Sequence, residues 1–181
     1  MKKAAFLDRD GVINEDVGHL NNTESFRLLP GAAAAIKKLN ESGYCVIVIT
    51  NQGAIAKGFL TIEILEGIHA KMRAQLAEKG AYIDRVYYCP HHPEGIVAEY
   101  SIACDCRKPA TNMFKEAIAD FNIDVTNSFL VGDKSSDILA GSRIGLRTVL
   151  LPGVRAASDI QYEVQPDFIA DDLMGAIAYF L

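Results

Sequence analysis

Five short apolar runs alternate with segments of helical character along this 181-residue chain, and that alternation restricts the possible folds more than any other feature. The runs are nearly continuous in Val, Ile, Leu and aromatic residues, which is typical of strands that are covered on both faces. Strands that alternate with helices indicate an α/β fold with right-handed crossovers. We therefore predict a Rossmann-like, doubly wound parallel sheet with strands at residues 4–7, 44–50, 85–89, 128–132 and 147–151.

The segments between these runs carry start and stop signals for helices. Pro30-Gly31 precedes an alanine-rich helical pattern that Gly43 would end, and Thr61 precedes a longer pattern that would end at Gly80. No repeat or linker interrupts the alternation, so we expect residues 1–181 to form one domain. Three further helices are predicted, beginning at residue 111 or 112, following residue 133, and covering 171–180.

Composition narrows the classes of function. The formal net charge of −5 argues against a nucleic-acid surface, which depends on clustered Lys and Arg. No apolar run reaches the roughly 18 residues that a membrane span needs, and the apolar stretch after Lys3 is too short for a signal peptide. We expect a cytoplasmic, monomeric protein whose partner is neither nucleic acid nor membrane.

Polar side chains follow several predicted strands at the edge where parallel sheets bind ligands. The first strand runs into Asp8 and Asp10, the second ends at Thr50, and the fourth runs into Asp133; Lys108 lies just before a predicted helix. Any one of these acids, taken alone, is more often a helix cap or part of a solvated turn. The set as a whole indicates phosphoryl transfer through an enzyme carboxylate.

Each residue type suits a part of that chemistry. Asp8 would attack phosphorus and form an aspartyl-phosphate, while Asp10 would protonate the leaving oxygen and then take a proton from water. Mg²⁺ held by Asp8 and Asp133 would offset the repulsion between carboxylate and phosphate. Lys108 and Thr50 would hold the non-bridging phosphate oxygens.

The segment 89–109 holds two pairs of soft metal ligands that a loop separates. The pairs are Cys89 with His91, and Cys104 with Cys106. Three thiolates and one imidazole predict a closed, structural Zn²⁺ site. The residues leave alternatives open: His92 in place of His91, a disulfide between Cys89 and either later cysteine, or three unrelated cysteines. The second pair runs directly into the segment that carries Lys108.

The segments "DRDGVIN", "TNQ", "RKP" and "GDKSSD" resemble, in this order, the four motifs of the haloacid dehalogenase superfamily of phosphatases, and the resemblance extends from about Ala4 to Val154. It implies a doubly wound sheet and Mg²⁺ dependence, with the backbone carbonyl of Asp10 as a further magnesium ligand. It also implies that Asp137 supports the metal through water or Lys134. Nothing of domain size separates the motifs, so we expect an enzyme without a cap domain.

Within this superfamily, the zinc-type loop is similar to that of the histidinol-phosphate phosphatases and the heptose 1,7-bisphosphate phosphatases. "YYCPHHPEG" and "CDCRKP" look most like the heptose enzymes, which usually have Ser-Gly where this chain has Gly53-Ala54. That resemblance implies hydrolysis of the 7-phosphate of a phosphorylated sugar, D-glycero-D-manno-heptose 1,7-bisphosphate, with Arg107 recognising the other phosphate. The further substrate contacts that it implies come from Asp16, Gly18, His19, Asn51, Gln52, Gly53 and Lys134.

Other interpretations compete with this one. Histidinol phosphate or another sugar bisphosphate is the alternative substrate. A receiver-like domain would also place acids at strand ends, but it would lack the acid–base Asp10 and leave the zinc loop unexplained. A zinc-stabilised binding module would leave the strand-end residues without a role. His69, in the middle of a helical pattern, is interpreted as structural.

Overall fold

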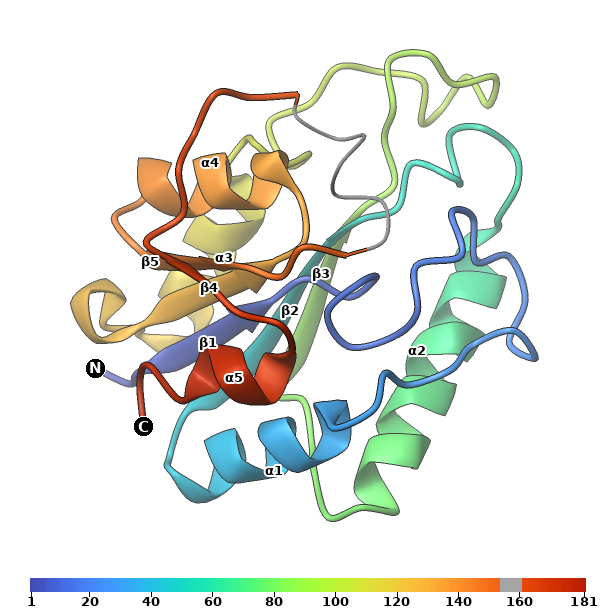
Figure 1. Ribbon diagram of the computed structural model, residues 1–181. Coiled ribbons are helices and arrows are strands. Elements are labelled where there is room, and N and C mark those ends of the chain that lie inside the picture. Colours follow the sequence, from blue (N-terminus) through green and yellow to red (C-terminus); the bar gives the residue numbers. More distant parts are fainter. Residues whose placement is uncertain (154–160) are drawn as a thin grey trace.

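The computed structural model describes residues 1–153 and 161–181; Val154, the last residue of the resemblance, lies outside the described residues. Its centre is a parallel sheet with the strand order β3-β2-β1-β4-β5-β6 (Figure 1). The predicted Rossmann-like, doubly wound α/β class is confirmed. The strands are β1 (Ala4–Leu7), β2 (Cys45–Asn51), β3 (Arg85–Cys89), β4 (Phe129–Gly132), β5 (Arg147–Leu150) and β6 (Phe168–Ile169).

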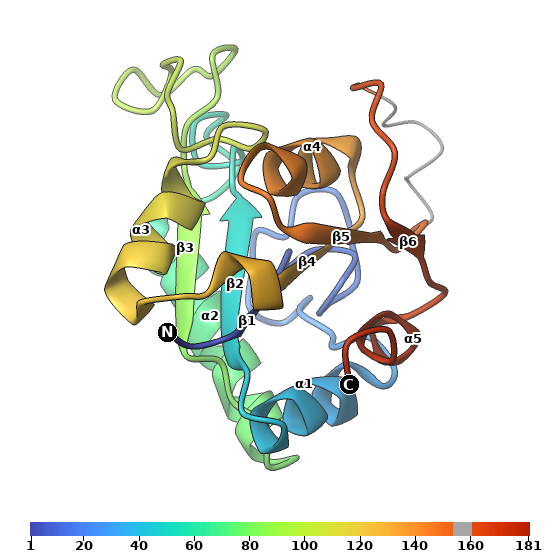
Figure 2. The same cartoon turned by 90° about the vertical axis from the view of Figure 1, so that its left-hand side faces the viewer.

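Helices cover both faces of the sheet. In the two views, α1, α2 and α5 lie on one side, while α3 and α4 lie on the other (Figure 1, Figure 2). None of the helices in the described ranges has the length and apolar character that crossing a bilayer requires. The helices are α1 (Ala32–Glu41), α2 (Ile62–Ala77), α3 (Asn112–Phe121), α4 (Ser135–Arg143) and α5 (Leu173–Ile177), with a 3-10 turn at Val125–Asn127.

The near-continuous apolar character of the strands follows from this double cover. Successive residues of β1 face opposite sides of the sheet. Ala5 and Leu7 belong to the core beneath α1, α2 and α5, whereas Ala4 and Phe6 belong to the core beneath α3 and α4. The ring of Phe6 packs on that of Phe114 of α3, with centroids 5.5 Å apart. Polar residues are thereby displaced to the strand ends, where the site forms.

The sequence signals locate the helix starts better than the ends. The Thr61 hydroxyl caps α2 by accepting a hydrogen bond from the amide of Ile64 at 3.3 Å, as its position predicts. However, α2 ends at Ala77, before the expected stop at Gly80. The edge strand β6 was not predicted, because it is only two residues long and partly exposed, and so has no buried apolar run to announce it.

Candidate active site

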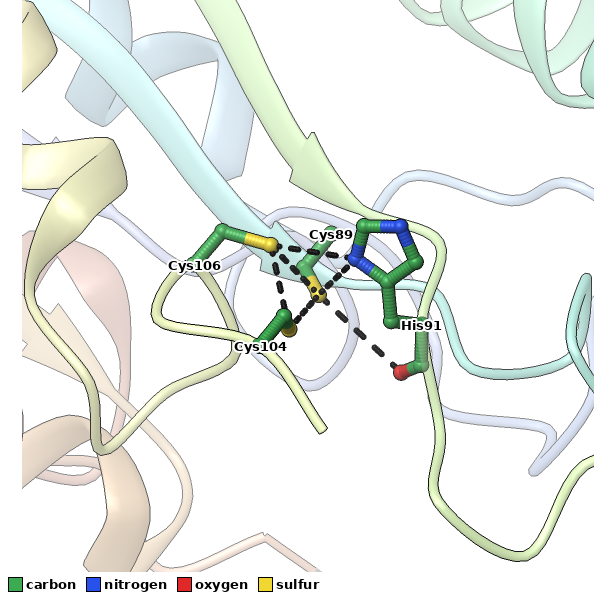
Figure 3. A group of neighbouring side chains, drawn as sticks. All are labelled: Cys89, His91, Cys104 and Cys106. Carbon is green, nitrogen blue, oxygen red and sulfur yellow. Dashed lines mark hydrogen bonds between the residues drawn. The ribbon is translucent and has the colours of Figure 1, made fainter. Parts of the chain in front are cut away.

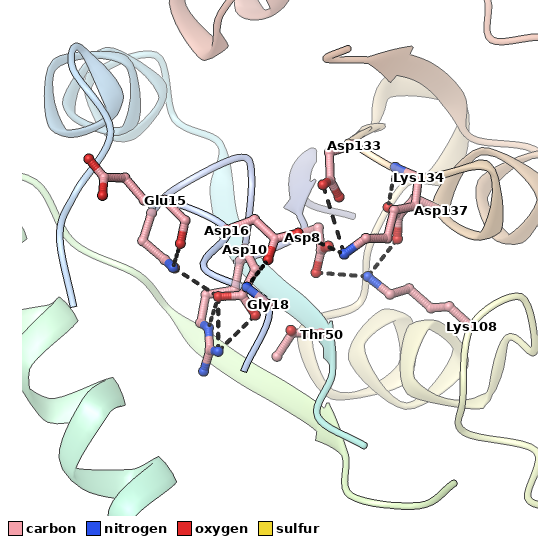
Figure 4. A network of polar contacts seen from close by, with 12 residues as sticks. Asp8, Asp10, Glu15, Asp16, Gly18, Thr50, Lys108, Asp133, Lys134 and Asp137 are labelled. Atoms are coloured by element: carbon pink, nitrogen blue, oxygen red, sulfur yellow. Dashed lines mark hydrogen bonds and ion pairs between the residues drawn. The ribbon is translucent and has the colours of Figure 1, made fainter. Parts of the chain in front are cut away.

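Three buried carboxylates and one buried lysine meet at the carboxyl edge of the sheet (Figure 4). Asp8 follows β1, Asp133 follows β4, and Asp137 lies in the first turn of α4; one carboxylate oxygen from each lies within 4.8 Å of the others. The ammonium of Lys108 lies 2.9 Å from Asp8 Oδ1 and 2.6 Å from Asp137 Oδ1, and it donates to the carbonyl of Ile49 at 2.6 Å. The topology thus brings together residues that are far apart in the sequence.

The charges of this group are incompletely balanced. Three carboxylates face two cations, because Lys134 Nζ is the second cation, 3.8 Å from Asp133 Oδ2. Burial, together with the charge of Asp8, raises the pKa of Asp133 to about 9. Burial also raises the pKa of Asp137, although Lys108 opposes the shift. The group would gain stability from a further positive charge.

The same residues fit a Mg²⁺ ion. Carboxylate oxygens are the ligands that this hard cation prefers. Asp133 Oδ1 is buried and has no hydrogen-bond partner among the described residues, so it is available as a ligand. Gly11 lies close to it: a Cβ on Gly11 would stand 2.4 Å from Asp133 Oδ2, and its φ of +82° is one that glycine tolerates best. This donor set suits the predicted magnesium.

The carboxylate of Asp10 has a different environment. Arg9 Nη2 donates to its two oxygens at 3.0 and 2.8 Å, and Arg9 Nε donates at 3.1 Å. The side-chain amides of Asn14 and Gln52 donate at 2.8 and 3.0 Å. Burial alone would raise the pKa of Asp10, but the charge of Arg9 and these hydrogen bonds hold it below its usual value. With its carboxylate engaged here, only the backbone carbonyl of Asp10 remains for the predicted magnesium contact.

The end of β2 holds its neighbours in place. The Gln52 amide also donates to Thr50 Oγ1 at 2.9 Å and so bridges Thr50 and Asp10. The Asn51 side chain makes two hydrogen bonds with the backbone of Lys108, donating to its carbonyl at 3.1 Å and accepting from its amide at 3.0 Å. Asn51 therefore orients the lysine loop, a role that the sequence did not predict.

Asp137 lies beside Asp8 and Asp133, close enough to support a metal ion there, and it also contacts two lysines. The prediction linked it to the metal through water or Lys134. Its Oδ1 contacts Lys108, and its Oδ2 accepts a hydrogen bond from the backbone amide of Lys134 at 3.1 Å, at the start of α4. The Lys134 ammonium lies 3.5 Å from Asp16 Oδ2 and 3.8 Å from Asp133 Oδ2. Asp137 thus orders the lysine that faces Asp8.

A cavity of about 290 Å³ opens beside Asp10. On one side His19 packs on Phe59, with ring centroids 4.9 Å apart. Lys57, which the sequence did not single out, also lines it, as does His92, which the sequence offered only as an alternative zinc ligand. Burial, and the charges of Arg107 and Lys57, lower the pKa of His92, so this side of the cavity is cationic. All the predicted substrate residues line the cavity: Asp16, Gly18, His19, Asn51, Gln52, Gly53, Arg107 and Lys134.

The predicted zinc ligands form a compact group (Figure 3). Cys106 Sγ lies 3.1 Å from Cys89 Sγ, 3.2 Å from Cys104 Sγ and 3.3 Å from His91 Nδ1. All four cysteines of the chain are free thiols, so no disulfide forms. His92 is outside the group, and its Nδ1 accepts a hydrogen bond from the backbone amide of Glu94. The structure places His91 in the group, and three sulfurs with one imidazole can hold a zinc ion.

The four predicted zinc ligands are joined directly to the segment that carries the residues predicted to bind phosphate. Arg107 and Lys108 follow Cys106 in the chain, and Arg107 Nη1 donates to the carbonyl of His91 at 3.2 Å. An ion that fixes His91 and Cys106 would therefore also fix the backbone from which Arg107 and Lys108 project.

Comparison with known proteins agrees with this geometry. A family model described as HAD-hydrolase-like matches residues 105–176. D-glycero-beta-D-manno-heptose-1,7-bisphosphate 7-phosphatase of Haemophilus ducreyi is 39% identical over 179 residues, which are 98% of this chain and 98% of that protein. The corresponding alpha enzyme of Photorhabdus laumondii is 44% identical over 80% of this chain and 79% of its own length. The chain belongs to the heptose-1,7-bisphosphate 7-phosphatase family of HAD-like hydrolases.

A solved structure supports the same family at the level of the fold. The D,D-heptose 1,7-bisphosphate phosphatase from B. bronchiseptica, complexed with magnesium and phosphate, superposes with a TM-score of 0.87 at 28% identity, covering 98% of this chain and 97% of that one. The prediction of a heptose-type haloacid dehalogenase enzyme is therefore confirmed at the level of family. Relatives named for both anomers of the sugar match this chain, so the comparisons leave the anomer open.

Proposed function

We propose that this chain is a Mg²⁺-dependent phosphatase that hydrolyses the 7-phosphate of D-glycero-D-manno-heptose 1,7-bisphosphate. The observation that carries the proposal is the group at the sheet edge, in which Asp8 lies 2.9 Å from Lys108 and beside Asp133. The names of the full-length relatives, and the magnesium and phosphate of the similar solved structure, agree with it.

The residues divide the reaction between them. A carboxylate oxygen of Asp8 forms a bond to phosphorus as the bond from phosphorus to the sugar oxygen breaks, and Asp10 gives that oxygen a proton. Asp10 then takes a proton from water, which attacks phosphorus and releases Asp8 and inorganic phosphate. Lys108 and Thr50 stabilise the charge on the phosphoryl oxygens throughout. Asp8, Asp133 and the carbonyl of Asp10 would hold Mg²⁺, whose positive charge would offset the repulsion between Asp8 and the phosphate.

The other phosphate of the substrate would bind in the cavity. Arg107, with its planar fork of donors, suits a phosphate better than a single ammonium does. Lys134 and Lys57 add positive charge around the same space. The remaining predicted contacts, from the loop 16–19 and from the end of β2, would hold the sugar between the two phosphates.

We assign Zn²⁺ to Cys89, His91, Cys104 and Cys106 as a structural ion, because four protein ligands leave no position for substrate. We further propose that the chain acts as one domain and as a cytoplasmic monomer. Gel filtration with light scattering tests the oligomeric state, and a dimer mass would refute that part.

Phosphate release tests the activity. The substrates are the α and β anomers of the heptose bisphosphate and histidinol phosphate, each with Mg²⁺, compared by kcat/KM because specificity is a difference in transition-state binding. The kcat/KM for one heptose anomer should exceed that for histidinol phosphate by orders of magnitude. If histidinol phosphate led, the fold and the nucleophile would stand, but the assignment of Arg107 would fail.

A matched pair of variants tests the nucleophile. Asp8→Asn should lose activity by several orders of magnitude, as removal of a nucleophile does. Asp171→Asn makes the same chemical change at an exposed site far along the chain and should keep full activity. Persistent turnover in Asp8→Asn would overturn the mechanism.

A further inference from the structure

A buried arginine and a buried histidine lie behind the site without a part in the proposed chemistry. Arg9 has an exposed fraction of 0%, and His69, on the inner face of α2, one of 1%. Arginine is almost never fully buried unless it is paired. Its presence here indicates that its contacts matter to the residues around it.

The guanidinium of Arg9 joins Asp10 to His69. Its Nε and Nη2 form the two-armed contact with the Asp10 carboxylate, which is only partly buried, with a side-chain exposed fraction of 20%. Its remaining nitrogen, Nη1, lies 3.3 Å from His69 Nε2. The result is a chain of three side chains that runs from the cavity, through the protein interior, to the middle of α2.

The direction of the hydrogen bond follows from the chemistry of the groups. A guanidinium has donors only, so Arg9 donates and His69 Nε2 accepts. His69 must then be neutral, with its proton on Nδ1. Burial and the charges of Arg9 and Arg73 lower the pKa of His69 to about 3, which agrees with a neutral ring. The ring is confined on a further side by Tyr88 of β3, with ring centroids 5.8 Å apart.

We propose that His69 is a positioning residue for the proposed reaction: by accepting from Arg9, it fixes the guanidinium that aims the Asp10 carboxylate at the leaving oxygen. A bidentate fork holds a carboxylate in one plane only if the guanidinium itself cannot rotate. Among the described residues, His69 Nε2 is the hydrogen-bond partner of Arg9 Nη1, so His69 is the residue that prevents this rotation. The inference rests on the proposed function, because it assumes that Asp10 transfers the proton.

The perturbation is His69→Leu, which keeps the apolar bulk on α2 and removes the acceptor. His69→Gln restores a neutral acceptor and should rescue the enzyme. Met72→Leu is the matched control, since Met72 is fully buried on the same helix and the exchange nearly conserves volume. Thermal unfolding of each variant establishes that the assay temperature lies below its transition.

The decisive measurement compares two leaving groups. A sugar alkoxide needs a proton from Asp10 as it leaves, whereas the phenolate of p-nitrophenyl phosphate leaves without one. The parameter is kcat/KM, because it covers the steps up to phosphoryl transfer to Asp8 and excludes the later hydrolysis. General acid catalysis contributes roughly 10²–10⁴-fold, so partial misplacement of the acid should cost about tenfold.

We expect His69→Leu to lose about tenfold in kcat/KM on the heptose bisphosphate and less than about threefold on p-nitrophenyl phosphate. His69→Gln and Met72→Leu should stay within about threefold of wild type on both substrates. Equal losses on the two substrates would mean that His69 acts only through stability, and no loss on the sugar would mean that it does not hold Arg9. Either result overturns the proposal.

A second variant covers the case in which His69→Leu does not fold. Arg9→Lys keeps the charge but loses both the fork and the contact with His69, so it should show the same dependence on the leaving group. If wild type hydrolyses p-nitrophenyl phosphate but not the heptose bisphosphate, the proposed substrate is wrong. The comparison is then made with whichever alkyl phosphate wild type accepts, and the inference about His69 is judged on that substrate.

Discussion

Replacing Gly11 by alanine should lower the magnesium-dependent activity by about 10²-fold, and the distances around Gly11 give the reason. The new Cβ would stand 2.4 Å from Asp133 Oδ2 and 2.7 Å from Asp133 Cγ. Non-bonded heavy atoms pack best at about 3.5–4.0 Å, so the carboxylate would have to move by about 1 Å. Asp133 cannot swing into solvent, because its side chain is only 3% exposed.

Two costs to stability add at this position. The φ of +82° is unfavourable for any residue with a Cβ by about 1–2 kcal/mol, and displacement of a buried neighbour typically costs about 1–3 kcal/mol more. A variant at Gly43 isolates the backbone cost from the cost of displacing a neighbour, because Gly43 has a φ of +76° and nothing within 4 Å of its Cβ position. Gly43→Ala should therefore be destabilised only by the backbone cost. Each kcal/mol should lower the thermal midpoint by roughly 2–4 °C.

The assay is phosphate release as a function of Mg²⁺ concentration, for Gly11→Ala and Gly43→Ala at the same temperature. A displacement of about 1 Å in a reacting site can cost about 10²-fold, so Gly11→Ala should lose about that in kcat/KM and need more Mg²⁺ for half-maximal rate. Gly43→Ala should match wild type. If the two variants were equally active, the close approach of Gly11 to the Asp133 carboxylate would not matter for activity.

Three further predictions follow from the other contacts. Cys104→Ala should abolish binding of the proposed zinc ion, which metal analysis would measure, and should lower the thermal midpoint. It should also lower the activity by roughly tenfold or more. Cys45→Ala, which lies outside the proposed zinc ligands, should keep the metal. The pKa of His69 is about 3 in the folded protein and 6.5 ordinarily, so between these pH values the unfolded chain binds a proton that the folded chain does not. The free energy of unfolding should therefore decrease as the pH falls through this range, by up to about 1.4 kcal/mol per pH unit. Urea unfolding at about pH 6.5 and about pH 4.5 should show a smaller decrease for His69→Gln than for wild type, and equal decreases would refute this. Gly53→Ala would place its Cβ 3.1 Å from Arg107 Nη1, so it should raise KM for the bisphosphate by about two- to fivefold and leave p-nitrophenyl phosphate unaffected; an unchanged KM would contradict a substrate contact by Arg107.

The fold was predictable because it depends on signals that are local in the sequence. Strands such as β2 are buried on both faces and therefore appear as unbroken apolar runs, and a threonine such as Thr61 marks a helix start by its own hydrogen bond. The order of the strands was not predicted, because the pairing of β1 with β4 joins segments that are far apart in the chain. The end of α2 is also local, because Gly80 has a φ of +72° and the amide of Ala81 donates to the carbonyl of Leu76 at 3.0 Å. The edge strand β6 has only two residues, so no local pattern indicated it.

The site was predictable where topology alone brings residues together. Asp8, Asp133 and Lys108 lie at strand ends or beside a helix start, and a parallel sheet places such positions on one edge. The individual side-chain contacts within the site were not predictable, because they depend on the direction in which each side chain points. Nothing in "TNQ" indicates that Asn51 faces the Lys108 backbone, and nothing in "GDKSSD" indicates that Asp137 contacts Lys108 and not the Lys134 ammonium.

Neither Arg9 nor His69 carries a local sequence signal for its contact with the other. An arginine between two aspartates suggests a solvated turn, since its charge favours water. Here the backbone turns back on itself, as the amides of Ile13 and Asn14 both donate to the Arg9 carbonyl, at 2.8 and 3.1 Å. The side chain of Arg9 is buried, and within the described part of the chain its hydrogen-bond partners are Asp10 and the neutral His69. The cost of burying an unpaired guanidinium makes these two contacts obligatory, and so the carboxylate of Asp10, the proposed acid–base residue, is held by the same interactions that allow the loop to fold.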